Sequence, residues 1–204
     1  MARLILVRHG QIAANVSSHW HGSTDSPLTD VGRTQAAQVA AFLRERATQA
    51  GTAPSAVYAS PLERTRHTAE AIASALGLQA QLEHDLREYG IGELEGTHYK
   101  TLMDEHRFFA RVEEDHHYAP PGGESVAAVA RRVLDALTRL EARHRGGEFV
   151  VVGHGAALGI ALGALFDANP TRWTQYGIRN CSVTELELHP VPRLVRLNDV
   201  AHLQ

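Results

Sequence analysis

Two tripeptides place a histidine beside glycine, each directly after a run of four apolar residues. They are Arg8-His9-Gly10, which follows Leu4 to Val7, and Gly153-His154-Gly155, which follows Phe149 to Val152. Continuous apolar runs are typical of central parallel strands, and ligands of open α/β sheets bind beyond the carboxyl ends of such strands. A histidine taken alone is more often a hydrogen-bonded core or loop residue. Because both follow strands that we expect to be neighbours, His9 and His154 are predicted to face one small ligand.

The segment from Ser60 to Arg64 follows a third short apolar run and predicts the start of a helix. Ser60 as the N-cap and Glu63 three residues later would form a capping box, with Pro61 at the first helical position. Arg64 then lies in the first turn. A helix N-terminus favours anions, and the guanidinium groups of Arg64 and Arg8 can hold phosphate oxygens in bidentate geometry. The sequence therefore predicts a phosphate site at this edge of the sheet.

Several carboxylates stand among glycines between residues 86 and 96, in a segment that cannot be a regular helix. One of them can serve as a general acid. Spacing alone does not choose among Glu88, Glu93 and Glu95.

Taken together, these motifs resemble the histidine phosphatase superfamily, in its phosphoglycerate-mutase-like phosphatase branch. The resemblance covers nearly the whole chain, and the common order of the motifs makes it specific. The matching motifs are Arg8-His9-Gly10, Ser60-Pro61-Leu62-x-Arg64, Glu88 before Glu95-Gly96, Gly123-Glu124-Ser125 and Gly153-His154-Gly155, with Asn15, the segment Gly22 to Ala36, and Asn180 to Val183 as further matches.

The resemblance implies a role for each of these residues. His9 would be the nucleophile, Arg8, Arg64 and His154 would hold the transferring phosphoryl group, and Glu88 would protonate the leaving oxygen. It further implies a phosphate contact from Asn15 and a set of substrate-binding residues, namely His21, Gly22, Ser23, Tyr89 and Gly155.

Physical chemistry agrees with that assignment. A neutral imidazole attacks phosphorus without losing a proton first, provided that cationic donors neutralise the phosphoryl oxygens, so neither a metal nor a cofactor is expected. An alkoxide is a poor leaving group and needs an acid, which can later accept a proton from water. The expected activity is metal-independent hydrolysis of small phosphomonoesters through a phosphohistidine. Ile12 and Ala14 depart from the family pattern, which has a Thr and often an aromatic there, and alter the inner wall of the pocket.

The alternative within the family is a cofactor-dependent phosphoglycerate mutase. A mutase must keep water off the phosphohistidine and hold a second phosphate. The segment 89–124 contains Lys100, Arg107 and Arg111 but lacks the adjacent arginine pair typical of the glycolytic mutases. Its acidic run 113–115 repels a polyanion if it faces the site, or simply faces solvent. We therefore expect hydrolysis.

Three readings of other classes compete with this one. A dinucleotide-binding module is suggested by the glycines from Gly153 to Gly159, but Gly159 falls one place late for the fingerprint. A metal hydrolase would use two histidine pairs, His19 with His21 and His116 with His117. A non-enzymatic binder that kept the fold would have lost His9, which is present.

The elements that position these residues alternate between short apolar runs and amphipathic stretches, which is typical of an α/β fold. Helical periodicity over 36–47 and 126–140 predicts helices that pack on the sheet. Period-two alternation from Thr184 to Leu188 predicts a half-exposed strand near the sheet edge, paired with 194–197. We predict a three-layer sandwich with a mostly parallel sheet, one antiparallel edge strand, and an insertion over about 89–124 that covers the active site like a lid.

Composition limits the remaining classes. The 204 residues predict a single domain over 1–204. One cysteine, Cys181, cannot form an internal disulfide, which favours the cytoplasm. Apolar runs are too short for a membrane span, and the net charge of -3 does not favour nucleic acid. The expected partner is a small phosphomonoester, and a homodimer is compatible with the sequence.

Overall fold

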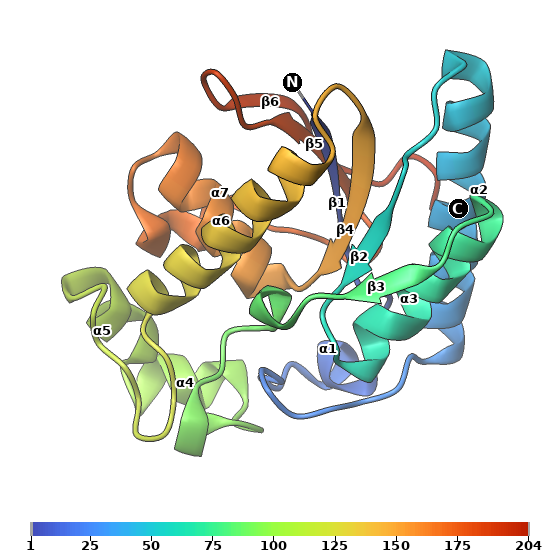
Figure 1. The fold of residues 1–204 in the computed structure, drawn as a ribbon. Helices are drawn as coiled ribbons and strands as arrows, with labels where there is room; N and C mark the ends of the chain where they lie inside the picture. The colour runs from blue at the N-terminus through green and yellow to red at the C-terminus, as the bar shows by residue number, and fades with distance from the viewer. Residues whose placement is uncertain (1, 204) are drawn as a thin grey trace.

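The computed structural model describes residues 2–203, which form a six-stranded sheet covered by helices on both faces (Figure 1). In chain order the elements are β1 (Arg3–Arg8), α1 (Ala13–Ser17), α2 (Asp30–Ala50), β2 (Val57–Ala59), α3 (Glu63–Ala75), β3 (Ala80–Leu82), η1 (His84–Leu86), η2 (Gly92–Leu94), α4 (Tyr99–Asp104), α5 (Phe108–Glu114), α6 (Val126–Arg143), β4 (Glu148–Gly153), α7 (Gly155–Phe166), η3 (Pro170–Tyr176), β5 (Val183–Glu187) and β6 (Arg193–Asp199).

The strand order is β3-β2-β4-β1-β5-β6, and the first four strands of that order are parallel. β1 and β4 pair in a register that sets Arg8 opposite Gly153. The predicted neighbours are therefore confirmed, and both histidine tripeptides emerge at one edge of the sheet. Both strands are apolar throughout because helices cover them on each face.

Two cores separate the three layers. α2 and α3 bury their apolar residues against one face of the sheet, and α6 and α7 bury theirs against the other. The predicted helices over 36–47 and 126–140 lie within α2 and α6. Side-chain caps begin both: Thr29 accepts a hydrogen bond from the Gly32 N–H, and Ser125 accepts one from the Ala128 N–H. The predicted three-layer α/β sandwich is confirmed.

The antiparallel pair β5 and β6 closes one side of the sheet, as predicted, but β5 is not half-exposed. Thr184 and Glu185 are only 2% and 3% exposed. β5 lies one strand in from the edge, and the Glu185 carboxylate is compensated by the guanidinium of Arg46 at 3.1 Å and that of Arg196 at 3.6 Å. Because these guanidinium groups compensate its charge, a carboxylate can occupy a polar position of the alternating pattern and still be buried.

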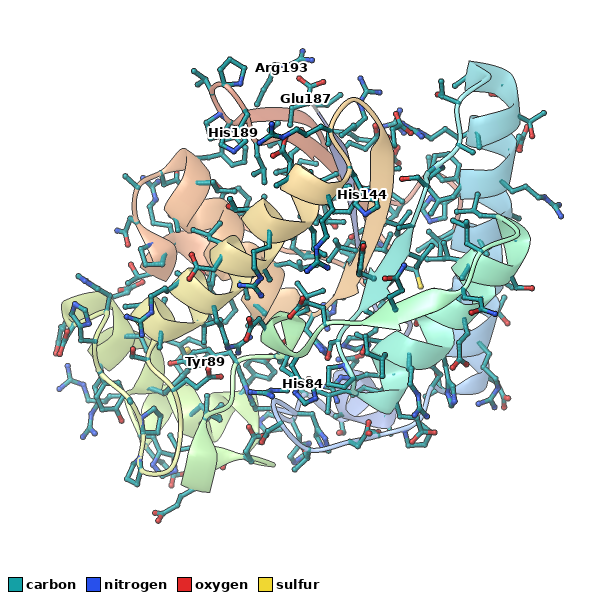
Figure 2. All side chains as sticks on the ribbon, in the orientation of Figure 1. His84, Tyr89, His144, Glu187, His189 and Arg193 are labelled. Carbon is teal, nitrogen blue, oxygen red and sulfur yellow. The ribbon has the colours of Figure 1, made fainter. Side chains whose placement is uncertain are left out.

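The segment 89–124 forms η2, α4 and α5 below α6 in Figure 1. Tyr89 begins it and is fully buried, with its ring 5.8 Å from those of Trp20 and Phe108. Figure 2 shows Tyr89 among packed side chains, well away from Glu187 and Arg193, which pair across the β5–β6 hairpin. That this segment acts as a lid, and that the chain is one domain, stay predictions.

No helix within residues 2–203 combines the length and the apolar character needed to cross a membrane.

Candidate active site

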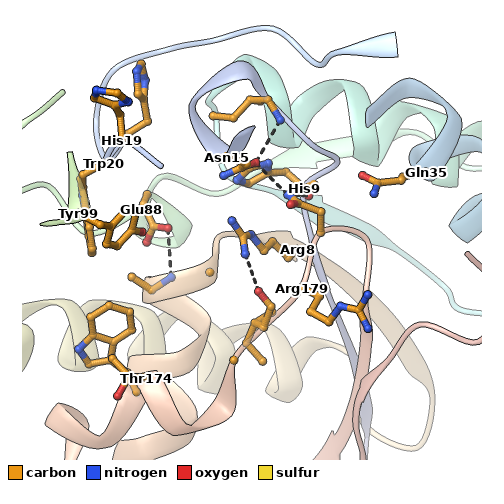
Figure 3. Close-up of a pocket in the computed structure, with 18 of the residues that line it drawn as sticks. Arg8, His9, Asn15, His19, Trp20, Gln35, Glu88, Tyr99, Thr174 and Arg179 are labelled. Carbon is orange, nitrogen blue, oxygen red and sulfur yellow. Dashed lines mark hydrogen bonds between the residues drawn. The ribbon is translucent and has the colours of Figure 1, made fainter. Parts of the chain in front are cut away.

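A cavity of about 610 Å³ opens at the carboxyl ends of β1 and β4 (Figure 3). Residues from all parts of the chain line it: Arg8, His9, Ile12, Asn15, His19, Trp20, His21, Gln35, Glu88, Tyr99, Phe109, Gly155, Ala156, Trp173, Thr174, Gly177, Ile178, Arg179, Asn180 and Leu203. The cavity thus lies where the sequence predicts the site, beyond the ends of these strands.

His9 is held in one orientation at the end of β1. Its backbone N–H donates to the Gly153 carbonyl at 3.0 Å, and its ring Nδ1 lies 2.7 Å from the Gly10 carbonyl oxygen. A carbonyl only accepts, so Nδ1 carries the proton and Nε2 keeps its lone pair. Burial, with the nearby charges of Arg8 and Arg64, holds the pKa of His9 well below its usual range. The neutral, Nε2-nucleophilic imidazole is thus the stable form.

His154 lies beside His9, with the ring centroids 5.3 Å apart. It is fully buried; its Nδ1 is 3.3 Å from the Nε of Arg64, and its Nε2 is 2.9 Å from the Ser60 hydroxyl. Burial and the Arg64 charge hold its pKa well below the usual range as well. The ring of His154 therefore lies beside that of His9, but His154 does not line the cavity.

Arg8 presents a guanidinium with unused donors. Its Nη1 donates to the Ile178 carbonyl at 2.6 Å, while its buried Nε has no partner among residues 2–203. Burial lowers the pKa of Arg8, and the Glu88 carboxylate opposes that shift. Gly155 makes this placement feasible, because a Cβ there would lie only 3.1 Å from the Arg8 Cζ. Arg8 lines the cavity, and a guanidinium at a cavity wall is suited to an anionic ligand.

Arg64 is fully buried and turned toward the loop before α2. Its Nη atoms donate to the carbonyls of Gly22 at 2.7 Å and Thr24 at 2.8 Å, with a longer bond to that of His21. Its guanidinium does not line the cavity. It acts on the site through its charge and through Nδ1 of His154.

The predicted capping box at Ser60 is wrong, although Arg64 does lie in the first helical turn. α3 begins at Glu63, and its N-cap residue Leu62 has no side-chain cap. The Ser60 hydroxyl instead contacts His154, and the Asp25 carboxylate accepts the Glu63 N–H at 2.8 and 3.0 Å. A distant carboxylate therefore does the capping that the local pattern assigned to Ser60.

Glu88 is the carboxylate that reaches the cavity. It accepts N–H groups of Tyr89 at 2.8 Å, Ala157 at 2.7 Å and Ala156 at 3.1 Å, so it sits on the free donors at the start of α7. The alternatives lie elsewhere: Glu93 is exposed, and Glu95 accepts backbone N–H groups of residues 22, 23 and 91. Of the three carboxylates among which spacing did not choose, Glu88 is the one that lines the cavity.

Asn180 was not among the predicted site residues. Its Nδ2 donates to the His9 carbonyl at 2.9 Å and to the Asn15 Oδ1 at 3.1 Å, and both amides line the cavity. The predicted edge strand could have indicated this residue. β5 is antiparallel to β1, so the residues just before β5 lie beside the end of β1.

The predicted substrate-binding residues divide into two groups. His21 and Gly155 line the cavity. The backbone N–H groups of Gly22 and Ser23 are bound to Glu95, and Tyr89 is in the core, so these three do not line it. Sequence reasoning missed an aromatic part of the wall, formed by Trp20, Tyr99, Phe109 and Trp173, and two polar residues, Gln35 and Arg179.

The charged residues of the segment 89–124 face away from the cavity. Lys100 pairs with Asp104, Arg107 with Glu114, and Arg111 contacts the Tyr118 hydroxyl. The acidic run 113–115 is exposed and does not line the cavity either. Of the two outcomes considered for these acids, the solvent-facing one holds.

The two histidine pairs of the metal-hydrolase reading do not share a site. His19 and His21 line the cavity, whereas His116 lines a separate hollow with Glu113. Across residues 2–203 no group of three or more His, Cys, Asp or Glu side chains is arranged to hold a metal ion.

Comparison with known proteins gives a consistent result. Residues 4–200 match the histidine phosphatase superfamily (branch 1). The probable phosphoglycerate mutase GpmB of Yersinia enterocolitica is 33% identical over 211 residues, covering 100% of this chain and 95% of that protein. Phosphoserine phosphatase from Entamoeba histolytica, solved with 3-phosphoglyceric acid, is 28% identical, with a TM-score of 0.88 and 100% coverage of both chains. A mycobacterial glucosyl-3-phosphoglycerate phosphatase solved with VO3 is 31% identical, with a TM-score of 0.84 over 97% of this chain and 99% of that one.

Proposed function

Because this chain belongs to the histidine phosphatase superfamily (branch 1), whose members compared above are phosphatases or mutase-like enzymes, we propose that it hydrolyses small phosphomonoesters. The reaction passes through a phosphohistidine on His9 and uses no metal ion. The observation that carries the proposal is the Nδ1 contact of His9 with the Gly10 carbonyl, which leaves the Nε2 lone pair free for attack.

The first half-reaction transfers the phosphoryl group to the enzyme. The His9 Nε2 lone pair forms the P–N bond as the ester P–O bond breaks, and protonated Glu88 gives its proton to the departing alkoxide oxygen. The guanidinium of Arg8 and the amide of Asn15, which both line the cavity, bind phosphoryl oxygens. Arg64 adds positive charge from behind His154, whose ring lies beside that of His9. An enzyme built this way needs no Lewis acid.

The second half-reaction returns the enzyme to its starting state. Ionised Glu88 takes a proton from water, the water oxygen bonds to phosphorus, and the P–N bond breaks to give inorganic phosphate and neutral His9. Glu88 ends protonated, ready for the next ester. Glu88 lines the cavity, and the backbone N–H groups at the start of α7 stabilise its ionised form, which is the form that accepts the proton from water.

Hydrolysis is proposed over mutase transfer on the basis of charge. The cationic residues of the segment 89–124 are engaged away from the cavity. Among the described lining residues, Arg179 is the one Lys or Arg besides Arg8. A mutase intermediate with a second phosphate would thus meet one exposed guanidinium.

The covalent step is tested by rapid quench with a ³²P-labelled ester. Label that is acid-labile and base-stable is expected on the wild-type enzyme, and it should vanish in His9→Ala. The exposed His189, which lies between β5 and β6 and does not line the cavity, supplies the matched control His189→Ala, which should keep full labelling. Label on serine or aspartate would overturn the mechanism. Activity that EDTA abolishes and zinc restores would overturn metal independence.

The acid is tested with Glu88→Gln. Turnover of alkyl phosphates should fall far more than that of p-nitrophenyl phosphate, whose leaving group hardly needs a proton. The exposed neighbour Glu93→Gln is the control and should leave both rates unchanged. Equal losses on both esters in Glu88→Gln would remove Glu88 from this role.

The mutase alternative has support from the relatives named probable phosphoglycerate mutase. It is tested by following conversion of 3-phosphoglycerate to 2-phosphoglycerate with and without 2,3-bisphosphoglycerate. Phosphate release should exceed conversion under both conditions. Mutase turnover above phosphate release would replace the proposed function with a phosphoglycerate mutase.

A further inference from the structure

One wall of the active-site cavity is a continuous aromatic surface. It consists of Trp20, Tyr99, Phe109 and Trp173, which all line the cavity, and we refer to these four residues as the aromatic wall. Trp20 lies 5.6 Å from Tyr99 and 5.9 Å from Trp173 between ring centroids. Phe109 closes the set at 6.1 Å from Trp173 and 6.2 Å from Tyr99. These spacings are those of packed aromatic pairs. Trp20 is buried beneath the other three rings' surface, and Tyr99, Phe109 and Trp173 are the more exposed members of the set.

The aromatic wall is on the side of the cavity that holds the proposed acid. Figure 3 shows Tyr99 and Trp20 near Glu88, while Gln35 and Arg179 lie across the view from them. Burial raises the pKa of Tyr99, and the charge of the Glu88 carboxylate raises it further, so the two groups lie within electrostatic reach of each other. The proton donor must approach the bridging oxygen of the ester, so the alcohol attached to that oxygen lies toward Glu88 and the aromatic wall.

Fixed charge is sparse where that alcohol would lie. Lys100 of α4 and Arg107, just before α5, are paired with carboxylates outside the cavity, and the sole carboxylate among the described lining residues is Glu88. A charged alcohol would lose water against the aromatic rings, and the charges nearest to Tyr99, those of Glu88 and Arg8, are already engaged in the proposed reaction. A neutral ring gains by burying apolar surface and by stacking.

From this arrangement we propose that the preferred substrates are monophosphate esters of uncharged alcohols that carry an aromatic ring, and that the aromatic wall binds this ring. The inference rests on the proposed function, because it uses Glu88 to orient the ester. It specifies the alcohol that leaves when the ester bond breaks, which the chemistry of His9 does not determine.

The test compares two primary alkyl esters of similar intrinsic reactivity, 2-phenylethyl phosphate and ethyl phosphate. The kcat/KM of the wild-type enzyme should favour the phenylethyl ester by about tenfold or more, which corresponds to about 1.4 kcal/mol. Phe109→Ala and Trp173→Ala should each lower that ratio by about fivefold or more. The ethyl phosphate rate of each variant measures any general effect of the substitution, and the ratio of the two esters corrects for it. Met103→Ala, an exposed apolar residue of α4 outside the cavity, is the matched control and should keep the ratio.

A binding measurement keeps the test decisive if a variant folds poorly. The chain has two tryptophans, Trp20 and Trp173, and both belong to the aromatic wall. In His9→Ala, 3-phenylpropylphosphonate should shift the tryptophan emission and saturate, whereas propylphosphonate at the same concentration should leave the emission unchanged.

The outcomes separate the inference from the function on which it rests. Phenylethyl and ethyl esters hydrolysed within twofold of each other, with labelled His9 still trapped, would overturn the inference alone. A preference for 3-phosphoglycerate that Arg179→Ala abolishes would also overturn it, because binding would then use charge on the opposite side. Failure to hydrolyse any of these esters, with no label on His9, would instead overturn the proposed function.

Discussion

The Nε atom of Arg64 lies 3.3 Å from Nδ1 of His154, and this contact fixes the tautomer of the buried imidazole. A guanidinium only donates, so Nδ1 accepts and Nε2 carries the proton toward the Ser60 hydroxyl at 2.9 Å. The same cation lies close enough to His9 to lower its pKa. Burial is the main reason why both imidazoles are neutral, and the charge of Arg64, together with that of Arg8, reinforces this state.

The neutral histidines predict how stability depends on pH. An unfolded histidine has a pKa of about 6.5, and the folded pKa values of His9 and His154 lie well below it. Between those values the unfolded chain binds more protons, so the free energy of unfolding falls as pH drops below about 6.5. Each group contributes up to roughly 1 kcal/mol per pH unit. Urea titrations from pH 7.5 to 5 should show a shallower dependence for His154→Asn.

The exposed His116 is the control for that series, and His116→Asn should reproduce the wild-type slope. An unchanged slope in His154→Asn would mean that this imidazole is not held neutral. The same shift predicts that kcat/KM has no acid limb near 6.5 due to His9.

Asp25 is predicted to stabilise α3 and, through it, Arg64. Its carboxylate accepts the Glu63 N–H, one residue before Arg64. Loss of a helix cap costs about 1 kcal/mol, so Asp25→Ala should lower the free energy of unfolding by that amount and reduce kcat/KM. Asp25→Asn should restore most of the stability. Asp30→Ala, in the first turn of α2, is the control, and equal kinetic effects in both would show that α3 is not special.

Gly155→Ala is predicted to impair catalysis with little effect on stability. The added Cβ would lie 3.1 Å from Cζ and 3.2 Å from Nε of Arg8, which is half-buried and hydrogen-bonded to the Ile178 carbonyl. The guanidinium must shift, and misplaced groups of this kind cost roughly tenfold in rate or more. Steady-state kinetics and a thermal melt measure both effects. Gly147→Ala, where the nearest atom is 3.6 Å away, should be silent in the kinetic assay.

Arg132 is predicted to act as a positioning residue for Glu88. Its Nη atoms donate to the carbonyls of Asp85, Arg87 and Glu88 at 2.7 to 2.9 Å, and its guanidinium pairs with Glu124. A lysine cannot serve these partners together. Arg132→Lys should therefore slow alkyl phosphates more than p-nitrophenyl phosphate, in the same direction as loss of the acid.

A purely structural role for Arg132 would slow both esters alike, in step with any loss of folded protein. The matched control lies on the same helix, where exposed Arg139 pairs with Asp85 at 2.7 Å. Arg139→Lys should leave the ratio of the two rates unchanged.

The strand-end part of the site was predictable because it follows from local rules. Apolar runs identify β1 and β4, and parallel pairing brings His9 and His154 to one edge. The Gly123-Glu124-Ser125 motif also follows local rules, because Ser125 caps α6 and Glu124 forms an ion pair with Arg132 of the same helix.

The remaining parts depend on contacts that no local pattern encodes. Asp25 caps a helix 38 residues away, and Asn180 reaches His9 across 171 positions. The alternating pattern of its strand predicts that Glu185 faces solvent. Glu185 is buried instead, and an ion pair with Arg46 of α2 compensates its charge. The direction of Arg64 likewise depends on where the carbonyls of the 21–24 loop happen to fold.

Phe109 belongs to α5 and Trp173 to η3. Both elements are separate from the end of β1, which carries Arg8 and His9, and from the start of α7. Each is only partly buried, so its replacement removes little of the core. The proposed reaction chemistry and the proposed alcohol preference thus depend on separate stretches of the chain. Substitutions at Phe109 or Trp173 are therefore expected to change which alcohol is accepted without moving the groups at the strand ends.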